Sequence, residues 1–291
     1  MRKVVITGAK GGTGPSILRA FSEAGFEVLG LDLKPCGIEE TGYRQVDLED
    51  GAQVHDVFAG ADAVVHFGSL PIDVWTAWEV AFRNLMLGGY HVLQAAANLR
   101  IPRLVLASSP MIYGEYKHAA YFPIDEESPA APIGIYGAAK QSLELLAQHY
   151  CRWHGLAIAA LRPQSIVYEG AYEWRLREYT GEDAAGVNKL WSFVDARDVA
   201  TACLAWIQSE RTGFQAFNVA ADNVCVRTPT RDLLRKFYPH ITDLRQELNG
   251  QTGLVSCAKI KRMLGWQPKY DWPAMEAESE AGHYARRPPP R

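Results

Sequence analysis

Short apolar runs alternate along the first half of the chain with longer segments in which apolar residues recur at helical spacing. Four runs have the length and the β-branched, apolar composition of strands buried on both faces: residues 4–7, 26–31, 63–66 and 104–107. Three segments have helical periodicity, two between these runs and one after them: residues 15–24, 75–99 and 136–153. This alternation predicts βαβ units and therefore an α/β fold of Rossmann type, with a doubly wound parallel sheet.

The second half of the chain is less regular. After an apolar run at 156–161, the stretch 167–191 is rich in charge and glycine and has weak periodicity. A helix at 196–208 and a strand at 214–219 would return to the main body. We therefore expect four parts: a dinucleotide-binding domain at 1–166, parts of 191–220 returning to it, a mainly substrate-binding lobe at 167–284, and a disordered tail at 285–291.

Composition narrows the class of protein. With 48% hydrophobic and 22% charged residues in 291, the chain is an ordinary globular protein, and its net charge of -3 disfavours a nucleic-acid partner. The five cysteines are dispersed, which indicates reduced thiols and offers no metal-ligand cluster. The apolar start of the chain is too short for a signal peptide or a spanning helix, so we expect a cytoplasmic protein without a membrane partner.

A glycine-rich loop, TGAKGGTG at residues 7–14, joins the first strand to the first helix. Gly8 permits a tight turn, Gly11 lets the backbone approach a pyrophosphate, and Gly14 allows close helix packing. The helix N-terminus offers unpaired N–H groups to the phosphates. A glycine turn can also join a strand to a helix without any ligand, but strand, loop and helix here agree on dinucleotide binding.

Two acidic positions support the same interpretation. Asp32 ends the second strand about twenty residues after the glycines, where a carboxylate holds the adenosine ribose and favours NAD. Lys34 could relieve the repulsion of a 2′-phosphate and leaves room for NADP. Asp47 could accept a hydrogen bond from the adenine amine, and Leu48 could cover the adenine ring. A solvent-exposed loop residue without a ligand is an equal alternative for Asp47.

A tyrosine and a lysine share one face of the helix that begins near residue 136. Tyr136 and Lys140 are four positions apart, and the strand before them ends in Ser108 and Ser109 at the sheet edge that carries the glycine loop. A phenol needs its pKa lowered by roughly three units from about 10 to act as a base near neutrality. One nearby cation lowers a pKa by about 1–3 units, and Lys140 and an oxidised nicotinamide would provide two. We expect Tyr136 to be the base, with Ser109 donating to the reacting oxygen.

These motifs together resemble the extended short-chain dehydrogenase/reductases, the NAD-dependent epimerase/dehydratase family, and among them the compact uronate dehydrogenases. Besides TGAKGGTG and YGAAK, the chain has SSPMIYG at 108–114, LRP at 161–163, FVDARDVA at 193–200 and LGWQP at 264–268, which are similar to family signatures. The resemblance implies that Ser109, Tyr136 and Lys140 are catalytic. It also implies a shell of residues around NAD: Gly8, Lys10, Gly11, Gly12, Thr13, Gly14, Asp32, Asp47, Leu48, Phe67, Gly68, Ser69, Asn84, Ser108, Tyr136, Lys140 and Pro163.

Departures from the family pattern bear on the substrate. Sugar-nucleotide dehydratases carry an acid pair where this chain has Pro110 and Met111, neither of which can move a proton. In uronate dehydrogenases an asparagine and a histidine contact the carboxylate of the substrate. Those two residues also correspond to Pro110 and Met111 here. The stretch 168–193 is much shorter than the segment that grips a sugar nucleotide in epimerases. Candidate anion-binding residues in that stretch are basic, with a solvated surface as their alternative: Arg175, Arg177 and Lys189.

The sequence thus predicts an NAD-dependent dehydrogenase that oxidises a hydroxyl of a small sugar-like or sugar-acid substrate. Two alternatives are left open: a sugar epimerase of the same fold, which returns the hydride and shows no net NADH, and a non-catalytic NAD-binding redox sensor. The two long helices at 75–99 and 136–153 could form a homodimer.

Overall fold

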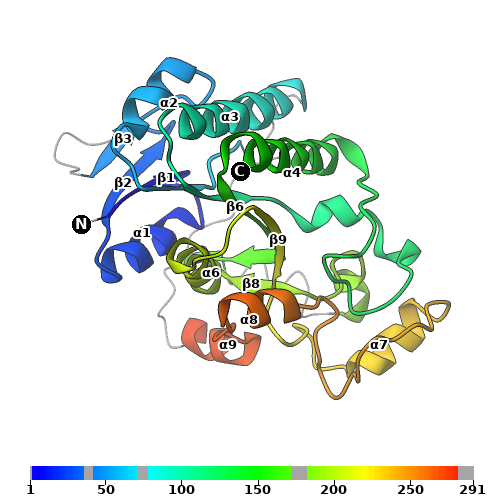
Figure 1. Cartoon of the computed structure of the whole chain (residues 1–291). Coiled ribbons are helices and arrows are strands. Elements are labelled where there is room, and N and C mark those ends of the chain that lie inside the picture. Colours follow the sequence, from blue (N-terminus) through cyan, green and yellow to red (C-terminus); the bar gives the residue numbers. More distant parts are fainter. Residues whose placement is uncertain (1, 36–41, 71–77, 172–181, 281–291) are drawn as a thin grey trace.

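The computed structural model describes residues 2–35, 42–70, 78–171 and 182–280 (Figure 1). Its centre is a sheet of seven parallel strands: β1 (Lys3–Thr7), β2 (Glu27–Asp32), β3 (Tyr43–Gln45), β4 (Ala63–His66), β5 (Arg103–Ala107), β6 (Ala157–Pro163) and β9 (Phe214–Val219). Their order across the sheet is β3-β2-β1-β4-β5-β6-β9. The parallel doubly wound sheet is therefore confirmed, and the predicted strands are found within a few residues of their expected limits.

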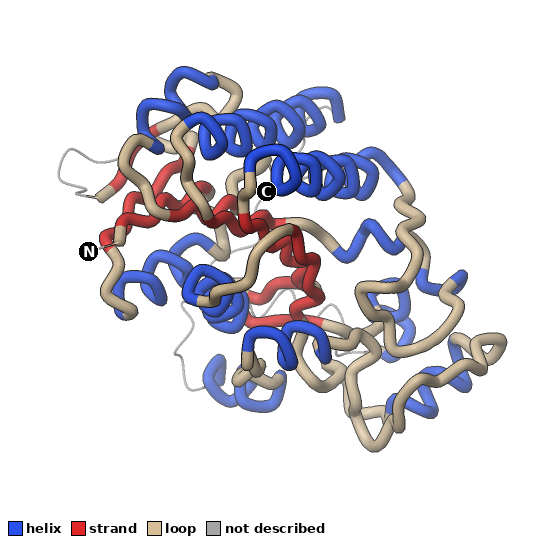
Figure 2. The backbone as a smooth tube through the Cα atoms, viewed as in Figure 1, coloured by secondary structure: helices blue, strands red, loops and turns tan. Residues whose placement is uncertain are grey.

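Helices cover both faces of this sheet. They are α1 (Gly14–Glu23), α2 (Gly51–Phe58), α3 (Trp78–Asn98), α4 (Gly134–His154), α6 (Ala196–Gln208), α7 (Thr230–Phe237), α8 (Ala258–Leu264) and α9 (Trp272–Glu280). Helices α2, α3 and α4 lie over one face and α1 and α6 over the other (Figures 1 and 2). Alternate residues of β1 point to opposite faces: Val4 and Ile6 join the core under α1 and α6, and Val5 joins the core under α2 and α3.

The order of the strands places a crevice next to β1. The chain runs from β1 outward through β2 to β3, and then returns to the other side of β1 to form β4. At such a switch of direction the loops after the two central strands separate, and ligands bind outside the carboxyl ends of the strands. The loops after β1 and β4 carry the glycine-rich segment and residues 67–70.

The less regular part of the chain forms a second group of elements below the sheet in Figure 1. A short parallel sheet pairs β7 (Ser165–Val167) with β8 (Phe193–Asp195), and a 3-10 helix covers Asp183–Lys189. Helix α8 packs against β9 of the main sheet. Isolated bridges join Phe122 to Leu244 and Ile124 to Val255, so the loop before α4 is tied to the C-terminal segment.

Two of the family-like motifs meet in this second group. The backbone N–H groups of Lys269 and Tyr270 donate to the buried Asp198 carboxylate, and Trp266 Nε1 donates to the Asp198 carbonyl oxygen at 3.1 Å. Burial raises the pKa of Asp198 to about 6, against the opposing effect of the two backbone hydrogen bonds. The FVDARDVA segment thereby anchors the LGWQP segment to the start of α6.

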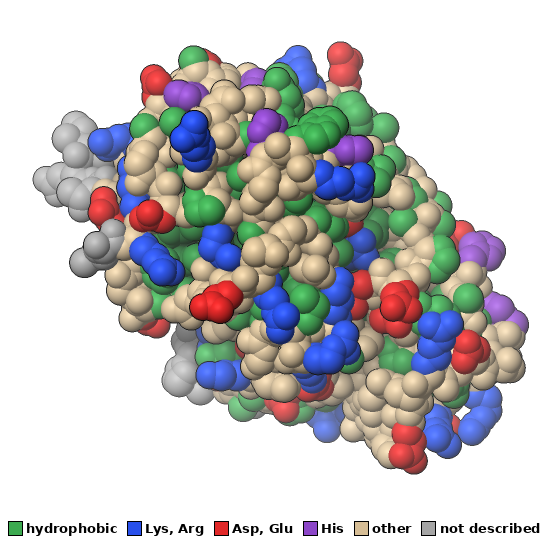
Figure 3. Space-filling model, in the orientation of Figure 1, with side chains coloured by type: hydrophobic (Ala, Val, Ile, Leu, Met, Phe, Trp, Pro, Cys, Tyr) green, Lys and Arg blue, Asp and Glu red, His purple; other side chains and the backbone are tan. Residues whose placement is uncertain are grey.

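Several surface features bear on the predictions from composition. Cys151, Cys203, Cys225 and Cys257 are free and buried, while Cys36 and the tail at 285–291 lie outside the described residues. Within the described part, no helix combines the length and apolar character needed to cross a membrane. Figure 3 shows Lys, Arg, Asp and Glu side chains interspersed over the face in view.

Candidate active site

A cleft of about 1480 Å³ opens at the carboxyl ends of the central strands. This volume exceeds the range of about 300–1,000 Å³ that is usual for a single small ligand, so the cleft has room for a cofactor and a substrate together. Many predicted site residues line it: Gly8, Lys10, Gly11, Gly12, Thr13, Gly14, Asp32, Asp47, Leu48, Phe67, Gly68, Ser69, Asn84, Ser108, Ser109, Tyr136, Lys140, Pro163 and Lys189. The fold thus brings the cofactor, catalytic and substrate candidates that it describes to one cavity.

The glycine loop is packed so tightly that side chains would not fit. Gly8 has φ of +73°, and a Cβ on it would lie 2.7 Å from the Phe67 carbonyl carbon. A Cβ on Gly14 would lie 2.3 Å from the Gly8 carbonyl oxygen, where the loop turns into α1. These glycines hold the loop against β4 and leave its backbone and the start of α1 facing the cleft, which suits a pyrophosphate.

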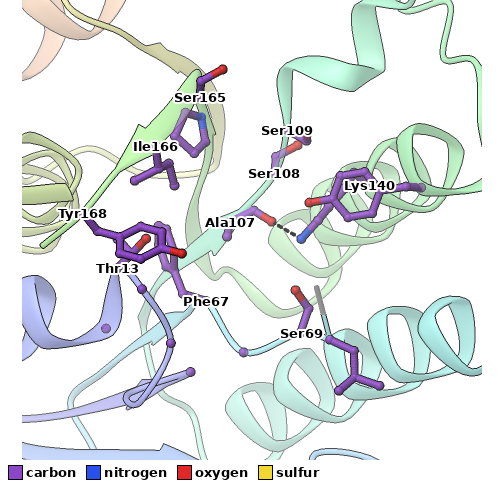
Figure 4. A pocket seen from close by; sticks show the side chains of 18 of the residues that line it. Thr13, Phe67, Ser69, Ala107, Ser108, Ser109, Lys140, Ser165, Ile166 and Tyr168 are labelled. Atoms are coloured by element: carbon purple, nitrogen blue, oxygen red, sulfur yellow. Dashed lines mark hydrogen bonds between the residues drawn. The ribbon is translucent and has the colours of Figure 1, made fainter. Parts of the chain in front are cut away.

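Tyr168 lies against the glycine loop from the opposite wall. A Cβ on Gly12 would lie 2.5 Å from Tyr168 Cε1, so the ring of this tyrosine rests on the bare backbone. Figure 4 shows Tyr168 beside Thr13, with Phe67 below it and Ile166 above. The chain after β7 therefore closes one side of the cleft.

Asp32 is held at the end of β2 by the loop itself. Its Oδ2 accepts from the Lys10 backbone N–H at 2.9 Å, and its Oδ1 accepts from the Lys34 N–H at 3.1 Å. Lys34 Nζ donates to the Lys10 carbonyl oxygen at 3.3 Å, which keeps that cation near the carboxylate. The arrangement places a fixed negative charge in the cleft where an adenosine ribose would lie in the dinucleotide-binding fold.

Asn84 on α3 stabilises the wall of the cleft near the loops after β3 and β4. Asn84 Oδ1 accepts from the Leu70 N–H at 2.9 Å, and Asn84 Nδ2 donates to Glu49 Oε1 at 3.3 Å. Asp47 Oδ1 accepts from the Glu49 N–H at 2.9 Å, and the neighbouring Leu48 side chain lines the cleft. Asn84 therefore ties the loop after β4 to the loop after β3.

A buried pair at the ends of β1 and β4 fixes the loop at 67–70 from below. The Thr7 hydroxyl and His66 Nδ1 are 2.8 Å apart, and the Gly68 N–H donates to Thr7 Oγ1 at 2.9 Å. Burial and, to a smaller extent, the charge of Lys140 together lower the pKa of His66 to about 3. His66 is therefore neutral and positions the loop without carrying charge.

Lys140 is buried between α4 and the end of β5. Its Nζ donates to the Ala107 carbonyl oxygen at 2.7 Å, the bond that Figure 4 marks, and lies 5.5 Å from the centre of the Tyr136 ring. Burial lowers the pKa of Lys140 to about 8, while the nearby Glu144 carboxylate opposes that shift. The predicted pair thus stands side by side at the cleft, with the ammonium group next to the phenol.

The two serines after β5 have different environments. Ser109 has an extended backbone at the start of a 3-10 helix (Pro110–Tyr113), and its Oγ accepts from the Met111 N–H at 3.2 Å. Ser108 turns away from that bond, and its hydroxyl donates to Glu144 Oε1. Both side chains are buried at the wall of the cleft, but Ser108 gives its hydroxyl hydrogen to Glu144, whereas Ser109 only accepts from the Met111 N–H.

Behind the serines lies a polar network that the sequence analysis did not single out. Arg162 Nε and Nη2 donate to Glu144 Oε1 and Oε2 at 2.9 and 2.7 Å, and Arg162 Nη1 donates to the Tyr113 hydroxyl at 2.7 Å. That hydroxyl donates in turn to Asn218 Oδ1 at 2.8 Å. One signal could have indicated it, because Glu144 follows Tyr136 and Lys140 at the same four-residue spacing.

Of the three basic residues predicted to bind the substrate, the structure describes one. Lys189 ends the 3-10 helix at Asp183–Lys189 and lines the cleft, while Arg175 and Arg177 lie outside the described residues. Pro110 and Met111 also line the cleft, at the end where Ser109 lies. Among the described residues, no cluster of His, Cys, Asp or Glu side chains is placed to hold a metal ion.

Sequence comparison places this site among known proteins. The model of the NAD dependent epimerase/dehydratase family matches residues 4–220. Uronate dehydrogenase of Pseudomonas putida is 32% identical over 164 residues, which cover 55% of this chain and 59% of that enzyme. The chain thus spans less than two thirds of that relative. UDP-glucose 4-epimerase of Lacticaseibacillus casei is 23% identical in an alignment 309 positions long, gaps included, which covers 92% of each chain.

Comparison of structures gives the same fold. A short-chain dehydrogenase/reductase superfamily protein from Agrobacterium tumefaciens, crystallised with bound NAD, superposes with a TM-score of 0.75 at 21% identity, and the match covers 97% of both chains. At this identity the likeness concerns the fold. It agrees with the parallel sheet flanked by helices.

Proposed function

Because the chain belongs to the NAD dependent epimerase/dehydratase family, we propose that it is an oxidoreductase that uses NAD to oxidise a hydroxyl of a small sugar or sugar acid. One observation carries the proposal: the buried Lys140 is fixed to the Ala107 carbonyl oxygen beside Tyr136, in the same cleft that the glycine loop opens. A structural lysine would not need to be buried next to a phenol at the wall of a large cavity.

The residues of the cleft fit NAD. The backbone of the glycine loop and the start of α1 face the cavity where a pyrophosphate would bind. Asp32 would accept from the ribose hydroxyls of the adenosine half, and its charge opposes the 2′-phosphate of NADP. Asp47 and Leu48 would receive the adenine, and Phe67, Gly68, Ser69 and Pro163 would line the nicotinamide half.

In the reaction, bound NAD supplies a hydride acceptor. Tyr136 removes the proton from the substrate hydroxyl as the C–H bond of the same carbon breaks, so that a carbonyl forms. Lys140 would favour the tyrosinate form of Tyr136 by its charge and would hold the nicotinamide ribose. Ser109 Oγ accepts from the Met111 N–H, so its hydroxyl hydrogen would remain available for donation to the reacting oxygen.

The substrate end of the cleft favours a small molecule. Pro110 and Met111 offer no proton donor or acceptor beside Ser109, which disfavours dehydration. Lys189, which also lines the cleft, supports binding of a carboxylate or phosphate. The uronate dehydrogenase relative fits this chemistry, and the shortness of the stretch 168–193 argues against a bulky nucleotide carrier.

The proposal is tested by NADH absorbance with purified protein, NAD and a panel of aldoses, uronic acids, polyols and sugar nucleotides. We expect turnover with at least one free sugar or sugar acid, and a rate with sugar nucleotides at least tenfold lower. Binding of NAD with no turnover on the whole panel would contradict the proposed dehydrogenase.

Epimerisation is the second candidate, because the similarity to UDP-glucose 4-epimerase extends over 92% of the chain. In that reaction the substrate carbon loses its hydride and regains it on the opposite face, so no net NADH forms. Product analysis by nuclear magnetic resonance separates the two reactions, since only epimerisation inverts a stereocentre without consuming NAD.

We also propose a cytoplasmic homodimer. The four free, buried cysteines suit a reducing compartment. Helices α3 and α4 lie together on one side of the molecule and expose large apolar side chains there: Trp78, Phe82, Tyr90, Ile135, Leu145 and Trp153. An exposed apolar surface of this kind is typical of an interface between copies. Sedimentation velocity of the wild type and of Leu145→Arg would show a dimer and its loss.

A further inference from the structure

Two large apolar side chains are exposed at the end of the cleft that carries Ser109 and Tyr136. Met111 is 46% exposed and Ile133 is 54% exposed, and both residues line the cavity. A single exposed apolar residue on an open surface is ordinary, but apolar surface inside a binding cleft gains free energy when an apolar part of a ligand covers it. These two residues therefore indicate what kind of group the bound substrate presents to them.

The two residues belong to the segments that carry the catalytic candidates. Met111 lies two positions after Ser109, and its N–H donates to Ser109 Oγ at 3.2 Å. Ile133 is the N-cap residue of α4, three positions before Tyr136. A Cβ on Gly137 would lie 2.6 Å from the Met111 carbonyl oxygen, so the first turn of α4 packs against the segment of Met111. A substrate that reaches the serine and the tyrosine would therefore also meet this apolar surface.

The same part of the wall is poor in positive charge. Within residues 109–136, all of which the structure describes, no Lys, Arg or His side chain lines the cleft. The nearby Lys140 donates to the Ala107 carbonyl oxygen. Glu115 does line the cleft, and the hydrogen bond from Lys117 lowers the pKa of its carboxyl group, which is ionised at neutral pH. A substrate carboxylate placed against this part of the wall would lose water for apolar contacts close to a negative charge.

We propose that Met111 and Ile133 are specificity-determining residues that receive the exocyclic group at C5 of a hexose, and that the enzyme prefers a 6-deoxy sugar, which has a methyl group there. The inference rests on the proposed function and narrows it from sugars and sugar acids to neutral sugars. A methyl group gains free energy on leaving water for contact with methionine and isoleucine. A hydroxymethyl group gains less because its hydroxyl must be desolvated, and a carboxylate loses most.

Lys189 gives the opposite expectation and makes the proposal testable. It ends the 3-10 helix at Asp183–Lys189, which precedes β8 and belongs to a different segment from Met111 and Ile133. If Lys189 held the exocyclic group as a carboxylate, a uronate would be the preferred substrate. The order of preference within one sugar series therefore distinguishes an apolar contact from an anion site.

The experiment measures kcat/KM by NADH absorbance at saturating NAD for two series of sugars. One contains 6-deoxy-D-galactose, D-galactose and D-galacturonate, and the other contains 6-deoxy-D-glucose, D-glucose and D-glucuronate. Within each series the molecules differ only in the group at C5, so the ratios of kcat/KM report the contacts of that group. In the series that is turned over, we expect the 6-deoxy sugar to exceed the hexose by about fourfold, as for one buried methylene group, and the uronate by about tenfold or more.

A substitution at Met111 tests the contact itself. Met111→Gln keeps the length of the side chain and replaces its apolar end by an amide that bonds to hydroxyl and carboxylate oxygens, while the backbone N–H still donates to Ser109. We expect the ratio of kcat/KM for the 6-deoxy sugar to that for the uronate to fall about tenfold. Leu33→Gln is the matched control, because Leu33 is also exposed and lines the cleft but follows Asp32 at the adenosine end. It should leave the ratios unchanged.

Four outcomes overturn the inference. Preference of the wild type for the uronate of a series would do so and leave the proposed dehydrogenase standing, and this measurement needs no variant that might fail to fold. Equal ratios in the wild type and Met111→Gln would show that the group at C5 does not reach Met111. Turnover confined to sugars outside the two series would overturn the inference and keep the proposed function. Binding of NAD without turnover of any sugar would remove both together.

Discussion

Glu144 and Arg162 form a bidentate ion pair behind the predicted catalytic residues. The Nε–Oε1 and Nη2–Oε2 distances are 2.9 and 2.7 Å. Both side chains are less than 10% exposed. The pair joins α4, which carries Tyr136 and Lys140, to β6, and it holds Ser108 at the end of β5. The three elements that build the reacting end of the cleft are therefore locked together by one carboxylate.

Removal of this carboxylate should destabilise the fold. In Glu144→Gln the Arg162 guanidinium keeps its burial and loses its counter-charge, so we expect a loss of about 3–5 kcal/mol in the free energy of unfolding. Asp232→Asn breaks the exposed pair with Arg235 on α7 and should cost less than about 1 kcal/mol. Guanidinium unfolding curves measure both. Equal losses in the free energy of unfolding for the two substitutions would show that the buried pair stabilises the fold no more than the exposed pair.

The burial of Lys140 should make stability depend on pH. The folded pKa is about 8, below the ordinary value of 10.5, so the unfolded chain binds the extra proton between these values. The stability of the wild type relative to Lys140→Met should therefore rise from pH 8 to 10.5, by up to about 1.4 kcal/mol per pH unit, and be lost as the pH falls through 8.

Thermal unfolding of both proteins across pH 7–10 measures this difference. Lys140→Met should also lose at least about a hundredfold of turnover, because the phenol loses its neighbouring cation. A difference in stability that stays flat from pH 7 to 10 would show that Lys140 is not buried as the structure describes.

Asp32 should decide the choice between NAD and NADP. Asp32→Asn removes the negative charge while keeping one acceptor for the backbone N–H groups of Lys10 and Lys34. We expect the NAD affinity to fall about tenfold and the NADP affinity to rise, since charge-assisted bonds to the ribose and the repulsion of a 2′-phosphate are both lost. Fluorescence titration with NADH and NADPH measures the two affinities.

Asp62→Asn is the matched control, because Asp62 accepts from the Lys3 N–H at 2.7 Å near the other end of β1. It should leave both affinities unchanged. If Asp32→Asn preserves the ratio of NADH to NADPH affinity, the adenosine ribose does not lie at Asp32.

The contact between Gly12 and Tyr168 should make the glycine loop intolerant of a methyl group. In Gly12→Ala the new Cβ would lie 2.5 Å from the Tyr168 ring, so the ring must swing into the cleft. We expect about tenfold weaker NADH binding, as a steric loss of about 1.4 kcal/mol. Adding Tyr168→Ala should recover most of it, whereas a double variant no better than Gly12→Ala would exclude this cause.

The sheet could be predicted from the sequence because strands such as Lys3–Thr7 and Ala63–His66 are buried on both faces, and such burial requires consecutive apolar residues. Local chemistry also placed the glycine loop and Asp32. The small β7–β8 sheet was not predicted, since its three-residue strands carry too few positions to establish a period.

The second tier of the site depended on tertiary contacts. Tyr113 and Asn218 are 105 positions apart and meet through one hydrogen bond at 2.8 Å, so no local pattern could indicate their contact. Composition and hydrophobic periodicity predict helices and strands, whereas the role of these residues depends on their tertiary contacts.

The central claim is that Tyr136 removes the substrate proton. The direct test compares NADH formation by the wild type and Tyr136→Phe on the sugar that the panel identifies, with Tyr150→Phe as a control on the same helix, where the hydroxyl donates to Gln94 at 2.7 Å outside the cleft. We predict a kcat lower by about a hundred- to ten-thousandfold in Tyr136→Phe, with NADH affinity retained and Tyr150→Phe unaffected. Turnover by Tyr136→Phe at the wild-type rate would contradict the account.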